Sequence, residues 1–178
     1  MVNGRRKGND YENEICRELS RWVRPSLPAK VLLADLPIRR RSTSIMPING
    51  LWHGAGDLLH KPELDEVWPF CVECKKVEGW TVDGFFNPKW SVRNWWDQAV
   101  AQARACGRVP LLICSRKQAP DYAILRERDA QCLRLQSLQL VLSQPGREDL
   151  SLLLLDDVVK AKPKLLRRLV STGRRSRT

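Results

Sequence analysis

The sequence predicts an α/β fold in which helices flank a mixed β-sheet, and three observations support this prediction. A helical pattern comes first, strand-like segments follow it, and a second helical pattern leads into a continuous apolar strand, an order that favours a mixed sheet with helices packed on it. Hydrophobic residues make up 43% of the chain, and its seven Trp add large apolar side chains for a core. The 178 residues suit one compact domain and are too few for two of ordinary size.

The first half of the chain is predicted to hold one helix, one edge strand and a hairpin. Apolar residues recur at steps of three and four in the helical segment, and two prolines follow its end. The edge strand combines a short apolar stretch with an arginine run. Two strand-like segments with a turn-rich sequence between them are typical of an antiparallel hairpin. In order, these elements are the helix over 9–24, the edge strand within 29–42, and the hairpin strands over 55–59 and 67–77.

The second half is predicted to hold a long helix, then strands separated by shorter helices. Gly107 ends the long helix, and a continuous apolar strand follows it. Pro163 is expected to interrupt the last helical segment, because proline breaks the helical hydrogen-bond pattern. In order, these elements are the helix over 91–106, the strands over 109–114 and 122–125, a helix over 127–136, the strands over 138–142 and 150–155, and a helix over 156–170.

The predicted hairpin brings two carboxylates to one face of the sheet. An antiparallel register that places Asp57 opposite Glu73 puts the turn at residue 65, which lies within the polar segment 63–66. Side chains opposed on one face have Cβ atoms roughly 4.5 to 5.5 Å apart, so both carboxylates can reach one cation. Lys75, two residues beyond Glu73, is expected to point to the same face.

This arrangement of two acids and a lysine predicts metal-dependent hydrolysis of phosphodiester bonds. Asp57 and Glu73 would hold Mg²⁺, with Mn²⁺ able to substitute, because a divalent cation offsets the repulsion between neighbouring carboxylates. Lys75 would orient the attacking nucleophile or stabilise the developing negative charge. The alternative is an ordinary surface salt bridge between Glu73 and Lys75, whereas the apolar neighbours on the strand favour a buried site.

Glu12 supplies a third carboxylate. It shares a helical stripe with Cys16, Leu19 and Val23 that borders the face expected to pack inward, so its side chain is directed toward the sheet. This position favours a catalytic role. In the alternative interpretation, Asn9 and Glu12 form a capping box, in which Glu12 only satisfies a backbone N–H group.

The charge distribution favours nucleic acid as the partner. The net charge is +11, and residues 158–178 hold eight basic and no acidic side chains. Basic ends around a near-neutral middle suit a polyanion better than a small acid. Solvated basic tails without a partner are the alternative, and charge alone does not separate a nucleic-acid-binding protein from an enzyme.

Other features of the sequence exclude several classes of protein and site. No apolar run approaches the roughly eighteen residues that span a bilayer, and the start of the chain shows no secretion signal, so a cytoplasmic protein without membrane contact is expected. The six cysteines are expected to be reduced. Cys71 and Cys74 would point to opposite faces of one strand and could not share a zinc ion there. His53 and His60 lack the spacing of metal ligands, so neither is expected to bind a metal.

These residues resemble the PD-(D/E)XK nuclease superfamily, and within it the archaeal-type Holliday junction resolvases with their bacterial and phage relatives. The similarity covers roughly residues 4–116 and rests on Arg6-Lys7-Gly8 with Glu12, on Gly56-Asp57-Leu58-Leu59, and on Val72-Glu73-Cys74-Lys75. It implies a restriction-endonuclease-like fold and a homodimer that cuts two strands of a four-way DNA junction. It also implies that Glu12, Asp57 and Glu73 are acidic active-site residues, the last two binding the metal, and that Lys75 is the catalytic lysine.

The basic runs and the resemblance together predict the DNA contacts and the domain organisation. Residues 1–157 would form the nuclease domain, and 158–178 a basic helix and tail. The family places a serine shortly before its Gly-Asp motif; here Ser42 and Ser44 are the candidates, and that role stays open. Alternatives are another nuclease of the superfamily that acts on duplex, flap or mismatch DNA, and a non-catalytic nucleic-acid-binding protein. The residues expected to contact DNA are Arg5, Arg6, Lys7, Arg40, Arg41, Ser42, Lys76 and Gln98.

Overall fold

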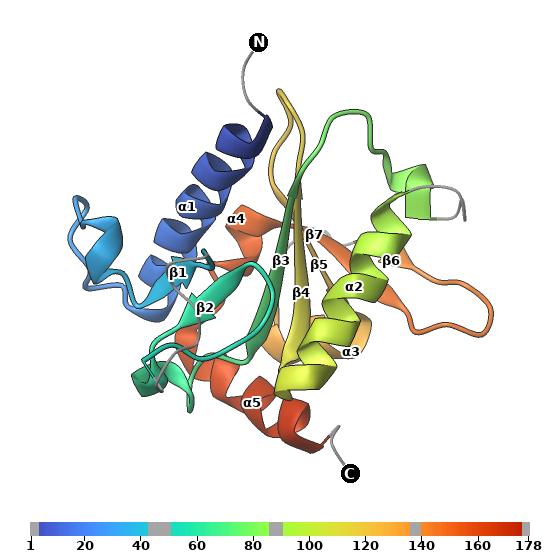
Figure 1. Ribbon diagram of the computed structural model, residues 1–178. Coiled ribbons are helices and arrows are strands. Elements are labelled where there is room, and N and C mark those ends of the chain that lie inside the picture. The colour runs from blue at the N-terminus through green and yellow to red at the C-terminus, as the bar shows by residue number, and fades with distance from the viewer. Residues whose placement is uncertain (1–3, 43–50, 86–90, 136–139, 176–178) are drawn as a thin grey trace.

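The computed structural model describes residues 4–42, 51–85, 91–135 and 140–175 (Figure 1). The helices are α1 (Gly4–Val23), α2 (Ser91–Cys106), α3 (Glu127–Leu133), α4 (Leu155–Val158) and α5 (Leu166–Arg175). The strands are β1 (Ile38–Arg40), β2 (Leu58–His60), β3 (Phe70–Lys76), β4 (Val109–Ser115), β5 (Tyr122–Arg126), β6 (Leu140–Leu142) and β7 (Leu150–Leu154). Short 3₁₀ helices are η1 (Leu33–Asp35), η2 (Pro62–Leu64), η3 (Val82–Phe85) and η4 (Pro163–Leu165).

Within the described residues, the strands form a five-stranded mixed sheet and a separate two-stranded antiparallel ribbon. The larger sheet has the order β3-β4-β5-β7-β6, so β3 lies at one edge. β3 and β4 are parallel, with α2 in the crossover between them, and the other neighbours in this sheet are antiparallel. The ribbon consists of β1 and β2, with Arg39 opposite Leu59. This mixed sheet with flanking helices confirms the predicted fold class.

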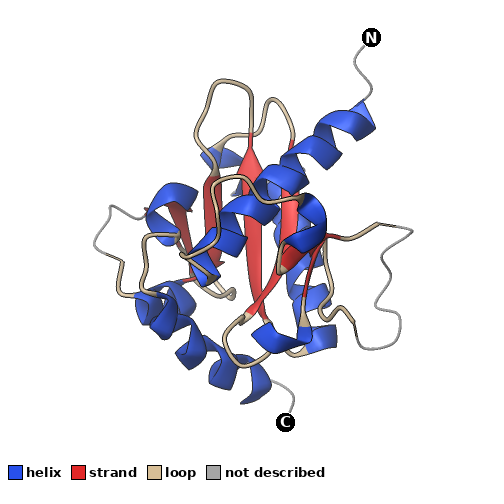
Figure 2. Ribbon diagram, turned by 90° about the vertical axis from the view of Figure 1, so that its left-hand side faces the viewer, coloured by secondary structure: helices blue, strands red, loops and turns tan. Residues whose placement is uncertain are grey.

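Helices cover both faces of the larger sheet (Figure 2). One face packs against α2 in a cluster that includes Trp96 of α2 and Leu112 of β4. The other face packs against α1, α3 and α5 in a cluster that includes Leu111 and Ile113 of β4. Neighbouring residues of β4 therefore point into different cores, as the alternation of a strand requires. β4 is buried on both faces, which explains why its sequence is apolar up to Ser115 at its end.

α1 begins at Gly4, five residues before the predicted start, and ends at Val23, before the prolines. Arginine and lysine are good helix formers, so the basic residues after Gly4 extend the helix beyond its buried part. Ile15 and Leu19 are fully buried and anchor α1 in the core. Among the described residues, no helix combines the length and the apolar character needed to cross a bilayer.

The antiparallel hairpin predicted for residues 55–77 is wrong. β2 pairs with β1 instead, and Gly56, two residues before β2, forms a parallel bridge with Val72 of β3. The connection between β2 and β3 holds η2, and Leu64 within it is buried in the core. The connection between β2 and β3 is therefore long and packed against the core, and it is not a tight turn. Such a connection allows the segments of Gly56 and Val72 to run parallel.

The edge strand predicted within 29–42 is shorter than its apolar sequence indicates. Only Ile38–Arg40 forms the strand, and the preceding apolar stretch turns into η1. Leu32 is 73% exposed, whereas Leu36 and Ile38 are buried. Core contact at these two later residues thus sets the position of β1.

The C-terminal segment is interrupted at Pro163, as predicted. α4 ends before this proline, and α5 follows it after one turn of 3₁₀ helix. Leu166 and Leu169 of α5 are fully buried in the same core as α1 and α3. The C-terminal segment predicted as a basic helix and tail therefore packs against the rest of the domain as far as Leu169.

Candidate active site

Asp57 and Glu73 come together at the edge of the larger sheet, through a pairing different from the predicted one. The backbone N–H of Asp57 donates to the carbonyl oxygen of Val72 at 2.9 Å. Oδ2 of Asp57 accepts the backbone N–H of Cys74 at 2.8 Å. Because Gly56 and Val72 form a parallel bridge, the next residue on each segment is Asp57 and Glu73, and the two become neighbours.

The Glu73 carboxylate is buried, and its two oxygens have different surroundings. The side chain is only 1% exposed. Oε1 accepts hydrogen bonds from Nζ of Lys75 at 2.5 Å and from Nε2 of Gln98 at 2.6 Å. Oε2 is buried and has no donor in hydrogen-bonding geometry among the described residues, although the nearby Gln102 amide lowers the pKa of Glu73. Leaving a buried carboxylate oxygen unpaired costs free energy, so this atom fits a cation held by Glu73 and Asp57.

Burial dominates the protonation of this site. It raises the pKa of Glu73 above its usual range, and the charge of Asp57 adds to this effect. Burial also raises the pKa of Asp57, although the Cys74 N–H and the Lys75 charge oppose it. For Lys75, burial favours the neutral amine, but the hydrogen bond to Glu73 and the negative charges of Glu73 and Asp57 together outweigh it and raise the pKa. The two carboxylates therefore retain protons more readily than exposed ones, and a bound divalent cation would favour their ionised forms.

α1 places Glu12 at the border of this site. The Glu12 side chain is 20% exposed, and its Oε2 lies 3.9 Å from Nε of Arg40. Burial, followed by the charge of Asp57, raises the pKa of Glu12 to about 7. The capping-box alternative is wrong, because α1 begins at Gly4 and Asn9 lies inside the helix, where its Oδ1 accepts a hydrogen bond from Arg40.

The Glu12→Gln variant is expected to be more stable than the parent at pH 8 in the absence of metal, and to gain much less at pH 5. The folded-state pKa of Glu12, about 7, exceeds its ordinary value of 4.5. Its ionisation therefore lowers the stability progressively between pH 4.5 and about pH 7, and the neutral glutamine avoids this cost. Thermal unfolding with a chelator at both pH values measures the difference from the parent. Glu14→Gln, which removes an exposed carboxylate from the same helix, is the matched control. An equal difference in thermal stability between Glu12→Gln and the parent at pH 5 and at pH 8 would contradict the raised pKa of Glu12.

Arg41 and Ser42 follow β1 and lie beside Asp57. The backbone N–H of Arg41 donates to the carbonyl oxygen of Asp57 at 2.6 Å. Ser42, the first serine candidate, is the residue that follows this backbone contact. Ser44, the other candidate, lies outside the described residues.

The remaining basic residues predicted to contact DNA lie along α1 and at the end of β3. Arg6 and Lys7 are exposed near the start of α1. Lys76 is exposed at the end of β3, with Nζ 4.8 Å from the centre of the Tyr11 ring. The Arg5 side chain lies outside the described residues. The side chains of Arg6, Lys7 and Lys76 are thus accessible to a polyanion.

Gln98 and Gly56 have structural parts in the site that sequence reasoning missed. The sequence predicts a contact between Gln98 and DNA; in the structure the Gln98 amide donates a hydrogen bond to Glu73 from α2 and so orients that carboxylate. Gly56 has φ +83°, and a Cβ at this position would lie 2.4 Å from the Val72 carbonyl oxygen. Only glycine allows so close an approach with this backbone conformation. The glycine directly before Asp57 was the available sequence signal.

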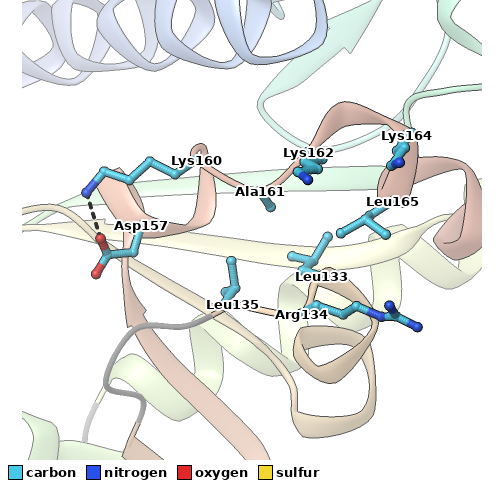
Figure 3. A pocket seen from close by; sticks show the side chains of 9 residues that line it. All are labelled: Leu133, Arg134, Leu135, Asp157, Lys160, Ala161, Lys162, Lys164 and Leu165. Atoms are coloured by element: carbon cyan, nitrogen blue, oxygen red, sulfur yellow. Dashed lines mark hydrogen bonds and ion pairs between the residues drawn. The ribbon is translucent and has the colours of Figure 1, made fainter.

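A basic pocket lies between the end of α3 and the segment 157–165 (Figure 3). Its volume is about 770 Å³. Asp157 pairs with Lys160 at 2.8 Å, which leaves an excess of positive charge. This composition suits an anionic ligand such as a phosphate group. The lining side chains are those of Arg134, Lys160, Lys162, Lys164 and Asp157, with Leu133, Leu135, Ala161 and Leu165.

A mixed sheet with flanking helices, and two carboxylates with a lysine at its edge, is the architecture of the PD-(D/E)XK nucleases. The chain belongs to the family described as "Phage putative PDDEXK endonuclease", whose model matches residues 3–145. No curated protein and no solved structure matches the chain. The family match confirms the superfamily and the restriction-endonuclease-like fold predicted from the sequence. It indicates an endonuclease whose substrate is DNA.

Proposed function

We propose that the protein is a Mg²⁺-dependent endonuclease that resolves four-way DNA junctions by paired symmetric nicks, acting as a homodimer. The observation that carries the nuclease chemistry is the buried Glu73 carboxylate, whose Oε2 lacks a partner beside Asp57 and Lys75. The junction specificity is supported by the resemblance of the motifs around Glu12, Asp57 and Glu73 to the junction resolvases. Membership of an endonuclease family supports the reaction class.

Asp57 and Glu73 are the residues that would hold the metal. Carboxylate oxygens are the ligands that Mg²⁺ prefers, and the unpaired Oε2 of Glu73 fits such a role. When bound, Mg²⁺ supplies Lewis-acid polarisation of the phosphate and a lowered pKa for the attacking water. Gln98 and Lys75 both bond Oε1 of Glu73, so they hold the carboxylate in one orientation and leave Oε2 available.

Lys75 and Glu12 supply the charge and proton chemistry. The raised pKa of Lys75 keeps its ammonium group protonated, so a positive charge faces the position where the phosphate gains negative charge. Glu12 has a pKa of about 7 and can therefore accept or release a proton near neutral pH. Both groups border the carboxylate pair from different elements, β3 and α1.

DNA would be held by basic side chains around the carboxylates. Arg40, Arg41 and Lys76 lie on the strands next to the site or in direct continuation of them, and the start of α1 adds further charge. Such contacts bind phosphates without reading sequence, which suits a nuclease that recognises the shape of a branched substrate. A symmetric dimer would present one active site to each of two opposed strands.

Cleavage of equal-length duplex, flap and four-way substrates, each with Mg²⁺ and with a chelator, tests this proposal. We expect paired, symmetric nicks in the four-way junction with Mg²⁺ and none with the chelator. Equal cleavage of duplex or flap DNA would reject junction specificity and retain a nuclease of another preference. Binding that persists in the chelator, together with no cleavage of any substrate in Mg²⁺ or Mn²⁺, would reject the nuclease assignment in favour of a binding protein.

A further inference from the structure

A second cluster of ligand-type side chains lies apart from the carboxylate pair. His53, His60 and Asp65 place their ligand atoms within 4.8 Å of one another, and in the described part of the chain they are the only His, Cys, Asp or Glu group of three to do so. Nδ1 of His53 lies 2.6 Å from Oδ2 of Asp65, and Nε2 of His60 lies 2.9 Å from Oδ1. The sequence predicted no metal ligand here, because the third member of the group comes from the turn after η2.

The backbone fixes the two histidines relative to each other. The N–H of His53 donates to the carbonyl oxygen of His60 at 2.8 Å, and the N–H of His60 donates to that of His53 at 2.9 Å. The His60 side chain is 1% exposed, whereas those of His53 and Asp65 are 38% and 29% exposed. The cluster is therefore anchored on its inner side and open to solvent on its outer side.

Nε2 of His60 has more contacts than one ring nitrogen can satisfy. It lies 3.1 Å from Nη2 of Arg108, which can only donate, and 2.9 Å from Oδ1 of Asp65, an acceptor when ionised. With a proton on Nε2, the Arg108 contact joins two donors; without a proton, the Asp65 contact joins two acceptors. A cation on the Nε2 lone pair would replace both contacts. Arg108 would keep its bonds to Oδ1 of Asp65 and to the carbonyl oxygens of Asp65 and Trp68.

We propose that His53 Nδ1, His60 Nε2 and Asp65 Oδ2 bind a zinc ion. Two imidazoles and one carboxylate form a donor set that zinc prefers, and the solvent-exposed side leaves a fourth position for water. Ligand atoms in a tetrahedral zinc site lie roughly 3.3 Å apart, so His53 and Asp65 would separate by about 0.7 Å from their present 2.6 Å. Both side chains are partly exposed and can make this movement. The Arg108 bond to the other carboxylate oxygen would orient Asp65 as a ligand.

This zinc ion would link the segments next to Asp57 and Glu73. His60 is the last residue of β2 and follows Asp57 by three positions, and Asp65 lies in the connection that leads to β3 and Glu73. A metal bound across these parts would stabilise their relative positions, since an ion that binds only the folded chain adds its binding free energy to the stability of the fold. The site shares no ligand with Asp57 and Glu73, so it does not depend on the proposed nuclease function.

Zinc titration of the full chain carrying both Asp57→Asn and Glu73→Gln tests the site without the carboxylate pair. We expect this background to bind one equivalent of Zn²⁺. Adding His53→Gln should weaken the affinity at least about tenfold, because glutamine can still bond Asp65 but offers no imidazole. Asp35→Asn, which removes an exposed acid outside the cluster, is the matched control and should leave the affinity unchanged.

Two further measurements complete this test. Thermal unfolding in a chelator shows whether the His53→Gln protein folds as its background does; Asp65→Asn provides a second variant if it does not. Co²⁺ in place of Zn²⁺ should give the visible absorption of a tetrahedral nitrogen and oxygen site. No Zn²⁺ binding, or equal affinity with and without His53→Gln and Asp65→Asn, would overturn the proposal and leave a hydrogen-bonded cluster. An intense thiolate-to-Co²⁺ band would also overturn it, because the metal would then sit on cysteines.

Discussion

Replacing Glu73 with Gln, or Asp57 with Asn, is expected to reduce DNA cleavage at least about a thousandfold while DNA binding persists. Each substitution keeps the shape of the side chain and removes the negative charge that holds a divalent cation. Glu73 is the more sensitive position, because its Oε2 is buried without another partner among the described residues. Single-turnover cleavage in saturating Mg²⁺ gives the rate, and a binding assay in a chelator gives the affinity.

Asp97→Asn is the matched control for these two variants. Asp97 precedes Gln98 on α2, but its side chain is 52% exposed and pairs with Arg93 at 3.6 Å. This variant should cut DNA at the parental rate. Thermal unfolding of all three variants separates a loss of chemistry from a loss of fold. Parental cleavage by a folded Glu73→Gln or Asp57→Asn protein would show that the site assignment is wrong.

The elements with strong burial patterns were predictable from the sequence, and the pairing of β2 was not. β4 is buried on both faces, so its apolar run located it to within one residue. Gly107 adopts φ +65° directly after α2, as expected for a glycine that ends a helix. β2 is only three residues long, and all three are buried. Such a segment shows no alternation of apolar and polar residues, so its sequence does not specify a partner or a direction.

The proximity of Asp57 and Glu73 was predicted correctly although the predicted hairpin was wrong, because two different strand registers bring these residues together. Antiparallel pairing would place Asp57 opposite Glu73, and the observed parallel bridge puts Gly56 against Val72 and makes the following residues neighbours. The position of Lys75 depends only on the alternation within β3, so its contact with Glu73 was also predictable. Contacts that depend on an irregular connection, such as those of Asp65 after η2, left no periodic signal in the sequence.

Gly56→Ala is expected to destabilise the fold by about 3 kcal/mol and to reduce cleavage at least about tenfold. Gly56 adopts φ +83°, and a Cβ there would lie 2.4 Å from the Val72 carbonyl oxygen and 3.1 Å from Oε1 of Gln102. The Val72 carbonyl oxygen also accepts the backbone N–H of Asp57. The clash can therefore be relieved only if this part of the chain moves away from β3, which displaces the Asp57 carboxylate from Glu73 even in molecules that remain folded.

Gly79→Ala separates the backbone strain from the close approach. Gly79 has φ +80°, almost the value at Gly56, but nothing lies within 4 Å of a Cβ at this position. Its substitution should cost about 1 kcal/mol and leave cleavage at the parental rate. Urea unfolding and cleavage below the unfolding transition measure both effects. If Gly56→Ala lost no more stability than Gly79→Ala and cut DNA normally, the bridge to Val72 would not be what positions Asp57. The two glycines share a backbone conformation and differ in their neighbours. Any greater loss of stability or cleavage at Gly56 is therefore due to its contact with Val72, which brings the carboxylates together.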